Sequence, residues 1–386
     1  MFYHKIWRDE FGEAYKKRGD TPAAARRRTA ESLLRLRKAL DWTPEAADPS
    51  DRGIPPKRFD TLLLATWNIR EFESAKYGFR LEESYYYIAE IISRFDLVAV
   101  QEVREDLDPV RKLLKIMGEW WDMLATDVTL GKRGNGERMV FLYDTRKVTF
   151  DGMAGELVIP PKDVTLPDGT KVKAQPAEQL YRTPYICTFS ARWRRLMLAT
   201  VHILYGEAVA DNPLRIKEIE TVAKFMRDLD KQETSRRYDT VILGDFNIFD
   251  PEDETLAAIK KAGFRIPKEL QGVPGTNVQK NKFYDQIAFR RIKDELDTTG
   301  NAGVFDLFRY LYRDPSGSDA DDMEAYSPAM GPALHTTSSG KPRANPRTYY
   351  KQWRTFQMSD HLPMWIELKT NFADEYISEK SGLPIP

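Results

Sequence analysis

The sequence predicts an α/β protein in which β-sheets are covered by α-helices, and three observations lead to this prediction. Short apolar runs rich in Leu, Val, Ile, Thr and aromatic residues recur from residue 59 onward, and each is too short for a helix. Two segments with helical spacing of apolar residues lie between these runs. Hydrophobic residues make up 41% of the 386 residues, which is enough for a sizeable core. The runs are TLLLATWNI, DLVAVQEV, RMVFLYD, YICTFSA, LMLATVHIL, DTVILGDFNIF, YDQIAF and LPMWIEL.

Residues 1–58 are expected to form a basic helical N-terminal arm followed by a proline-rich linker. Thr21 and Pro22 form a helix start, with threonine as N-cap and proline at the first helical position. Apolar residues then recur near helical spacing from Ala30 to Leu40. Residues 1–40 hold eleven Lys or Arg and five Asp or Glu. This predicts either an arm that contacts nucleic acid, a protein partner or a second copy of the chain, or a helix that packs its leucines on the main body.

Residues 59–370 are expected to form the main domain, which contains all of the predicted strands. Its first helix covers roughly Leu81 to Ser93, and its second begins at Asn212 and Pro213. Residues 312–348 are rich in Pro, Gly, Ser and charge, and they predict a long loop inserted before the last strand. Residues 371–386 are expected to be a C-terminal tail.

Composition and charge exclude several classes of protein. The formal net charge of +0 predicts no global attraction to nucleic acid or to an anionic membrane. Cys187 is the only cysteine, so an intramolecular disulfide and a cysteine-based zinc site are excluded, and its apolar surroundings predict a buried residue. No run reaches the ~18 apolar residues of a membrane helix, and the N-terminus has no apolar signal region. We therefore expect a cytoplasmic protein without stable membrane association.

Several apolar runs end in, or are preceded by, a residue that can bind a metal ion or transfer a proton. Catalytic groups are often held at strand ends by a rigid sheet. Oxygen ligands from Asp, Glu and Asn suit Mg²⁺, Mn²⁺ or Ca²⁺, and such an ion can polarise a phosphoryl oxygen. Each residue alone is more often a turn former, a cap or a structural histidine, so the joint pattern carries the hypothesis. The set comprises Asn68, Glu102, His202, Asp245, Asn247, Asp285, Asp360 and His361.

The ordered motifs TWNI, QEV, ER before an apolar run, TVH, GDFN, YDQI and SDHLP resemble the endonuclease/exonuclease/phosphatase superfamily, in particular its deoxyribonuclease I-like branch. The resemblance covers about residues 59–370. It implies a four-layer αββα sandwich of two mixed β-sheets flanked by helices. It also implies a hydrolase of phosphate esters that depends on Mg²⁺ or Mn²⁺, with Ca²⁺ as a candidate second ion.

The resemblance implies metal ligands and phosphate contacts at matching positions. Asn68 and Glu102 would bind the metal, with Asp360 nearby. Asp245 and Asn247 would orient the attacking water, contact the phosphate or bind a second metal. These roles place oxygen ligands around a single reacting phosphate.

The resemblance also implies two histidine–carboxylate pairs. Asp285 would hydrogen-bond His361 and leave its other ring nitrogen facing the phosphate as general base. Glu137 and His202 would form the second pair. A histidine at position 202 favours the deoxyribonuclease I-like, sphingomyelinase-like and genotoxin-like branches over AP endonucleases, which typically have tyrosine there.

Three further positions bear on the substrate. Arg104 and Arg182 match arginines with which the DNA-cutting branch contacts DNA or phosphate, and arginine suits bidentate phosphate binding. The alternative for each is a surface ion pair. Asn135 stands where the secreted enzymes have an aromatic residue that lies along a DNA groove. The N-terminal arm and residues 312–348 have no counterpart that can be placed.

Cations and aromatic residues alternate in SSGKPRANPRTYYKQWRTFQ, directly before Ser359. They predict either a nucleic-acid track with cations on phosphates and aromatics on bases, or aromatics that pack the inserted segment on the core. Overall we predict a divalent-metal-dependent nuclease, an endonuclease with DNA expected over RNA as substrate. The alternatives are a phosphatase or a phospholipid or sphingomyelin phosphodiesterase of the same fold, and a binding module without activity.

Overall fold

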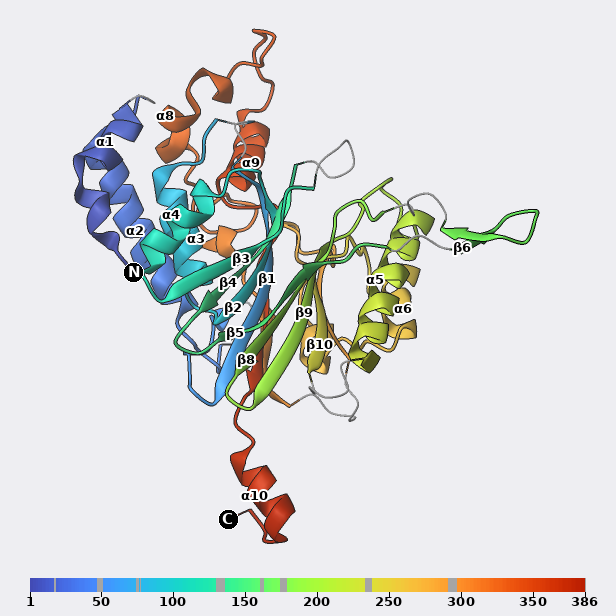
Figure 1. Ribbon diagram of the computed structural model, residues 1–386. Coiled ribbons are helices and arrows are strands. Elements are labelled where there is room, and N and C mark those ends of the chain that lie inside the picture. Colours follow the sequence, from blue (N-terminus) through green and yellow to red (C-terminus); the bar gives the residue numbers. More distant parts are fainter. Residues whose placement is uncertain are drawn as a thin grey trace.

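Two β-sheets packed face to face form the centre of the molecule (Figure 1). The computed structural model describes residues 1–16, 19–46, 51–73, 76, 78–129, 136–159, 163–173, 179–232, 238–290 and 297–385. The six-stranded sheet has the order β12-β13-β1-β2-β4-β3. Its strands are β1 (Thr61–Phe72), β2 (Leu97–Val103), β3 (Trp121–Ala125), β4 (Arg138–Asp144), β12 (Thr298–Val304) and β13 (Met364–Lys369).

The second sheet has five strands in the order β11-β10-β9-β8-β5. These are β5 (Thr149–Glu156), β8 (Tyr185–Ala191), β9 (Arg194–His202), β10 (Asp239–Asp245) and β11 (Asp285–Arg290). The pairs β1–β2 and β9–β10 are parallel and the other described pairs are antiparallel, so both sheets are mixed. A small hairpin of β6 (Asp163–Thr165) and β7 (Lys171–Lys173) projects to one side (Figure 1). All eight predicted strands are present.

Helices cover the outer faces of both sheets (Figure 1). α3 (Glu82–Ile92) and α4 (Asp108–Met117) lie beside the six-stranded sheet, and α5 (Pro213–Gln232) and α6 (Glu254–Lys261) lie beside the five-stranded one. The short α7 (Lys268–Gln271) precedes β11. Asn212 caps α5, because its Oδ1 accepts from the N–H of Leu214 at 3.0 Å. The predicted sandwich of two mixed sheets flanked by helices is confirmed.

The N-terminal segment packs on the main body. It forms a 3₁₀ turn at Tyr3–Trp7, α1 (Asp9–Lys16) and α2 (Pro22–Leu40), and α2 lies against α3. The Thr21 side chain caps α2 as predicted, by accepting from the N–H of Ala24 at 3.2 Å. Arg28 of α2 forms ion pairs with Glu83 of α3 at 2.7 Å and with Asp20 at 2.8 Å. Two alternatives were predicted for this arm. The structure has the second, a helix that packs on the main body.

The inserted segment is a set of short helices that packs on the same side as the N-terminal helices. It contains a 3₁₀ turn at Glu324–Tyr326, α8 (Ser327–Met330) and a turn at Gly331–Leu334, and α9 (Pro346–Gln357) follows it. Tyr350, Trp353 and Phe356 of α9 are buried. Of the two alternatives predicted for these aromatics, packing on the core is therefore the one observed, because α9 is amphipathic and turns its rings toward the core. A 3₁₀ turn at Leu307–Arg309 precedes the segment.

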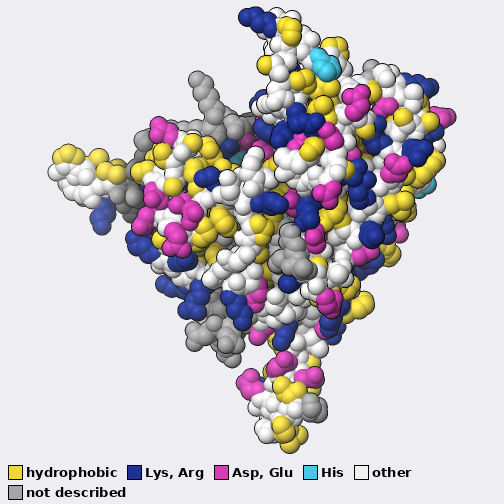
Figure 2. Space-filling view, turned by 180° about the vertical axis from the view of Figure 1, so that it is seen from behind, with side chains coloured by type: hydrophobic (Ala, Val, Ile, Leu, Met, Phe, Trp, Pro, Cys, Tyr) yellow, Lys and Arg dark blue, Asp and Glu magenta, His cyan; other side chains and the backbone are white. Residues whose placement is uncertain are grey.

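Surface composition agrees with the formal net charge of +0. On the face in Figure 2, Lys and Arg side chains are interspersed with Asp and Glu. The last helix, α10 (Ala373–Ser381), extends away from the body (Figure 1). Cys187 is buried in β8 as predicted, and burial raises the pKa of its thiol to about 12. In the described part of the chain, every helix is too short or too polar to cross a membrane.

Candidate active site

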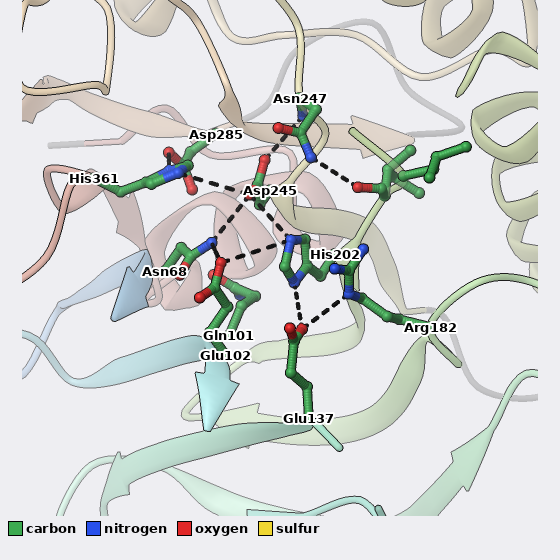
Figure 3. A network of polar contacts seen from close by, with 12 residues as sticks. Asn68, Gln101, Glu102, Glu137, Arg182, His202, Asp245, Asn247, Asp285 and His361 are labelled. Atoms are coloured by element: carbon green, nitrogen blue, oxygen red, sulfur yellow. Dashed lines mark hydrogen bonds and ion pairs between the residues drawn. The ribbon is translucent and has the colours of Figure 1, made fainter. Parts of the chain in front are cut away.

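The ends of strands from both sheets meet at one edge of the sandwich (Figure 3). Across the five-stranded sheet, Asp245 at the end of β10 is the register partner of His202 on β9 and of Asp285 on β11. From the six-stranded sheet, Asn68 of β1 and Glu102 of β2 reach the same place. The sequence predicted these residues at strand ends, and the packing of the two sheets brings them together.

Glu102, His202 and Asp245 form a group whose ligand atoms all lie within 4.8 Å of one another. The Asn68 Nδ2 donates to Glu102 Oε1 at 2.9 Å and to Asp245 Oδ2 at 3.0 Å. The Asn68 Oδ1 is buried and has no hydrogen-bond partner among the described residues. Clustered carboxylates fit a hard divalent cation, since such an ion would offset their mutual repulsion.

Backbone conformation near this cluster is strained. Glu102 has φ +60°, Glu71 has φ +38° and Asn247 has φ +54°. Side chains other than glycine rarely adopt this region, and such residues gather where function requires them. Glu102 lies where the register of β2 with both neighbours shifts, and its Oε2 accepts from the N–H of Glu71 at 2.8 Å. The bulge re-aims the Glu102 carboxylate toward the cluster.

Asp285 and His361 form the first histidine–carboxylate pair. The His361 Nδ1 lies 2.7 Å from Asp285 Oδ2, and the His361 Nε2 lies 3.8 Å from Asp245 Oδ2. Burial opposes the charged imidazolium, but Asp285 and Asp245 outweigh it and raise the pKa of His361 well above its ordinary value. Asp285 is itself positioned, because its N–H donates to Thr276 Oγ1 at 3.0 Å.

Glu137 and His202 form the second pair. The His202 Nδ1 lies 2.8 Å from Glu137 Oε2, and the His202 Nε2 lies 3.4 Å from Asp245 Oδ2. The Arg182 Nε donates to the same Glu137 oxygen at 2.9 Å. Burial and the Arg182 charge lower the pKa of His202, and the Glu137 hydrogen bond and charge more than offset them, so that this pKa is raised. Arg182 is thus held at the site by Glu137.

Asn247 fixes the carboxylate that the two histidines share. Its backbone N–H donates to Asp245 Oδ1 at 2.9 Å, and its Nδ2 donates to Ile203 O at 2.7 Å. The positive φ of Asn247 turns the chain sharply after β10 and makes the first of these bonds. Asp245 can therefore present its Oδ2 to Asn68 and to both histidines.

Two predicted residues lie outside this cluster. The Asp360 side chain is 41% exposed and pairs with Arg70 at 3.4 Å. Arg104 follows β2, and its backbone N–H donates to Phe72 O at 2.9 Å, with no ion pair of its side chain among the described residues. Asn135 falls outside the described residues. Arg70 was not predicted from the sequence. It stands two residues after Asn68 in TWNIR, and alternate residues of a strand lie on the same face, so this spacing could have indicated it.

Ser359 ties the loop that carries His361 to β1. Its buried Oγ donates to Asn68 O at 2.6 Å and accepts from the N–H groups of His361 at 3.0 Å and Arg70 at 3.2 Å. These bonds hold β1, which carries Asn68, and the loop of His361 at a fixed spacing. In the sequence Ser359 appears only as the first residue of the motif SDHLP, and its own role appears in these contacts.

Replacing Ser359 by alanine is expected to lower activity about 10- to 100-fold, the size seen when groups that orient metal-site residues are removed. It should also lower the free energy of unfolding by about 1–3 kcal/mol, because two N–H groups lose their buried acceptor. Rates of phosphodiester hydrolysis and urea unfolding test the two expected effects, and Ser339→Ala, at an exposed serine of the inserted segment, is the control. Wild-type activity in Ser359→Ala would remove the residue from the positioning network.

Two curated proteins match this sequence. A deoxyribonuclease of Thioalkalivibrio sp. (strain K90mix) is 28% identical over 259 residues, which cover 65% of this chain and 63% of that protein. Deoxyribonuclease-1 of Oryctolagus cuniculus is 29% identical over 194 residues, which cover 48% of this chain and 61% of that protein. The chain thus spans less than two thirds of the length of either relative. No family model matches.

Among solved structures, an endonuclease/exonuclease/phosphatase family protein of Bacteroides thetaiotaomicron is 14% identical, with a TM-score of 0.47 over 82% of this chain and 99% of its own. D. rerio TDP2 complexed with single strand DNA product is 14% identical, with a TM-score of 0.48 over 80% of this chain and 99% of its own. The ordered motifs and the two sequence matches to deoxyribonucleases support the resemblance of the chain to the endonuclease/exonuclease/phosphatase superfamily.

Proposed function

We propose that this protein is a divalent-metal-dependent phosphodiesterase that cleaves nucleic acid internally, with DNA expected over RNA. The arrangement of two histidines around one carboxylate carries the proposal. The His202 Nε2 lies 3.4 Å and the His361 Nε2 3.8 Å from Asp245 Oδ2, and a second carboxylate holds the far side of each ring. Two oriented imidazoles beside a hard-ligand cluster can supply a base and an acid to one phosphate.

The metal in this proposal is Mg²⁺ or Mn²⁺, with Ca²⁺ as a candidate second ion. Glu102 and Asp245 would hold it, together with the amide of Asn68, and Asp360 adjoins them on the exposed side. When bound, such an ion offsets negative charge on the phosphoryl oxygens. Asn247 keeps the Asp245 carboxylate in place through its backbone N–H.

The chain's own groups would move the protons. His361 takes a proton from the attacking water at Nε2, and Asp285 stabilises the imidazolium that forms at Nδ1. His202, whose pKa is raised by Glu137, faces the cluster from the opposite side and would donate a proton toward the leaving oxygen. Arg182, beside Glu137, and Arg104, at the end of β2, would contact substrate phosphates.

The choice of nucleic acid is supported by two relatives that are named deoxyribonucleases. The same catalytic groups could also serve a phosphatase or a phospholipid or sphingomyelin phosphodiesterase. The substrate class must therefore be tested separately from the reaction class.

A substrate panel tests the proposal directly. The purified chain is incubated with supercoiled plasmid, single-stranded DNA, RNA, a phosphomonoester and sphingomyelin vesicles, each with Mg²⁺, Mn²⁺, Ca²⁺ or EDTA. We expect nicking and then linearisation of plasmid with Mg²⁺ or Mn²⁺, and none with EDTA or with Asp245→Asn. Hydrolysis of the phosphomonoester or of sphingomyelin, with plasmid left intact, would overturn it.

A further inference from the structure

A cavity of about 700 Å³ opens directly beside His361 and Asp360. Its other walls come from Arg70 at the end of β1, the loop at residues 277–280, residues 306–308, residues 316–317 and α9. The volume lies within the range of about 300–1,000 Å³ that is typical of small-ligand sites. Because His361 lies on its wall, a group that occupies the cavity lies next to the phosphate at which His361 would act as the base.

The lining of this cavity is rich in cations. Both of its carboxylates are already paired, Asp306 with Lys280 at 2.9 Å and Asp360 with Arg70 at 3.4 Å. Val278, Phe308 and the ring of Tyr284 supply apolar surface between these charged groups. The charged side chains of the lining are Arg70, Lys280, Lys351, Arg354, Asp306 and Asp360, besides His361.

Lys351 is the cation of this lining that is most available to a ligand. Its side chain is 42% exposed, and its partner Asp314 lies outside the lining at 3.3 Å. Burial disfavours the charge on Asp314, but hydrogen bonds from Ser316 and Arg347 hold its pKa well below its usual value. The negative charge of Asp314 is therefore stabilised by Ser316 and Arg347 even when Lys351 contacts a ligand. Arg354, in contrast, is buried and donates to Tyr312 O at 3.0 Å.

We propose that this cavity binds a second phosphate of the substrate, the one next to the scissile phosphodiester along a polynucleotide strand. The inference rests on the proposed function and names a specificity site for it. Lys351 and Lys280 contact the second phosphate, and Arg70 lies at the boundary between the cavity and the cluster. Lysine and arginine are the side chains that bind phosphate oxygens by charge-assisted hydrogen bonds. The amides of Gln279 and Gln352 in the lining suit the neutral parts of a nucleotide.

Short substrates test this binding site. The dinucleotide TpT is compared with pTpT and TpTp, which add one terminal phosphate at either end of the same scissile bond. One of the two phosphorylated forms is expected to have a kcat/KM about tenfold or more above that of TpT, as hydrogen bonds to a charged group imply. Lys351→Ala should remove this preference and Lys351→Arg should keep it. Lys224→Ala, at an exposed lysine of α5, is the matched control.

The salt dependence on a longer single-stranded oligonucleotide is the second readout. The slope of log KM against log salt concentration should fall by about one in Lys351→Ala, because one phosphate contact is lost, and should not change in Lys224→Ala. Equal rates on all three dinucleotides, or equal slopes in both variants, would overturn the second-phosphate site. Failure of wild type to cleave any polynucleotide would instead overturn the proposed function.

Discussion

His361→Ala is expected to lower kcat about 10²- to 10⁴-fold, the range that a positioned general base contributes. The ring is held at Nδ1 by Asp285 at 2.7 Å and presents Nε2 toward Asp245, so its loss removes the proposed base and leaves the cluster of Glu102, His202 and Asp245 in place. The rate of plasmid nicking at saturating Mg²⁺ measures the effect, and KM is expected to change much less than kcat.

The chain offers a matched control for this substitution. His335 is an exposed histidine of the inserted segment, and His335→Ala should keep the wild-type rate. Thermal unfolding of both variants shows whether the fold survives, since Asp285 loses its partner in the first one. A His361→Ala rate within threefold of wild type, in a folded protein, would remove His361 from the mechanism.

Asp285→Asn should move the pH profile as well as the rate. Burial lowers the pKa of His361, but the Asp285 and Asp245 charges raise it well above the ordinary value. A general base works when deprotonated, so the rising limb of kcat against pH lies at high pH in the wild type. Without the Asp285 carboxylate the pKa of His361 falls, and this limb should move to lower pH while kcat drops. An unchanged limb would mean that a different group titrates.

Much of this site could be predicted from the sequence because its residues stand at the ends of apolar strands. A strand that is buried on both faces must be almost wholly apolar, so the first polar residue after it marks the sheet edge. Asn68 and Asp245 were predicted in this way, whereas Asp285 follows the short run Phe283-Tyr284 and begins β11. The register of the sheet then places Asp245 between His202 and Asp285. The helix starts at Thr21 and Asn212 could be predicted for a similar reason. Each capping side chain accepts a hydrogen bond from an N–H group in the first turn of its own helix, so the signal is local in sequence.

The parts that could not be predicted depend on contacts between distant segments. The cavity beside His361 is lined by residues that lie as far apart in sequence as Arg70 and Lys351. A local sequence pattern therefore cannot predict it. For α9, the alternation of cations with aromatics predicted either a nucleic-acid track or aromatics packed on the core. Which face of that helix is buried depends on what packs against it, and the rings of Trp353 and Tyr312 turned out to meet in the core at 5.6 Å.

Glu102→Gln is expected to abolish metal dependence and to lower kcat on the order of 10³-fold, since charge offset by a metal is worth several kcal/mol in the transition state. Glutamine keeps the shape of the side chain and removes its charge, and the Glu102 carboxylate belongs to the ligand cluster. Calorimetry with Mg²⁺ or Mn²⁺ should show binding in the wild type and none in the variant. Glu105→Gln, at an exposed glutamate three residues on, should match the wild type in both measurements.

Stability should change in the opposite sense from activity. Burial raises the pKa of Glu102, and the charges of Glu137 and Asp360 add to this although His202 opposes it. A carboxyl group with a raised folded-state pKa binds its proton more tightly when folded, so at neutral pH the ionised group weakens the metal-free fold. Glu102→Gln should therefore have a metal-free unfolding temperature equal to or above that of the wild type, and should lose the rise that Mg²⁺ gives the wild type. A variant that unfolds earlier without metal, yet still gains stability from Mg²⁺, would show that Glu102 supports the fold and that the ion is held elsewhere.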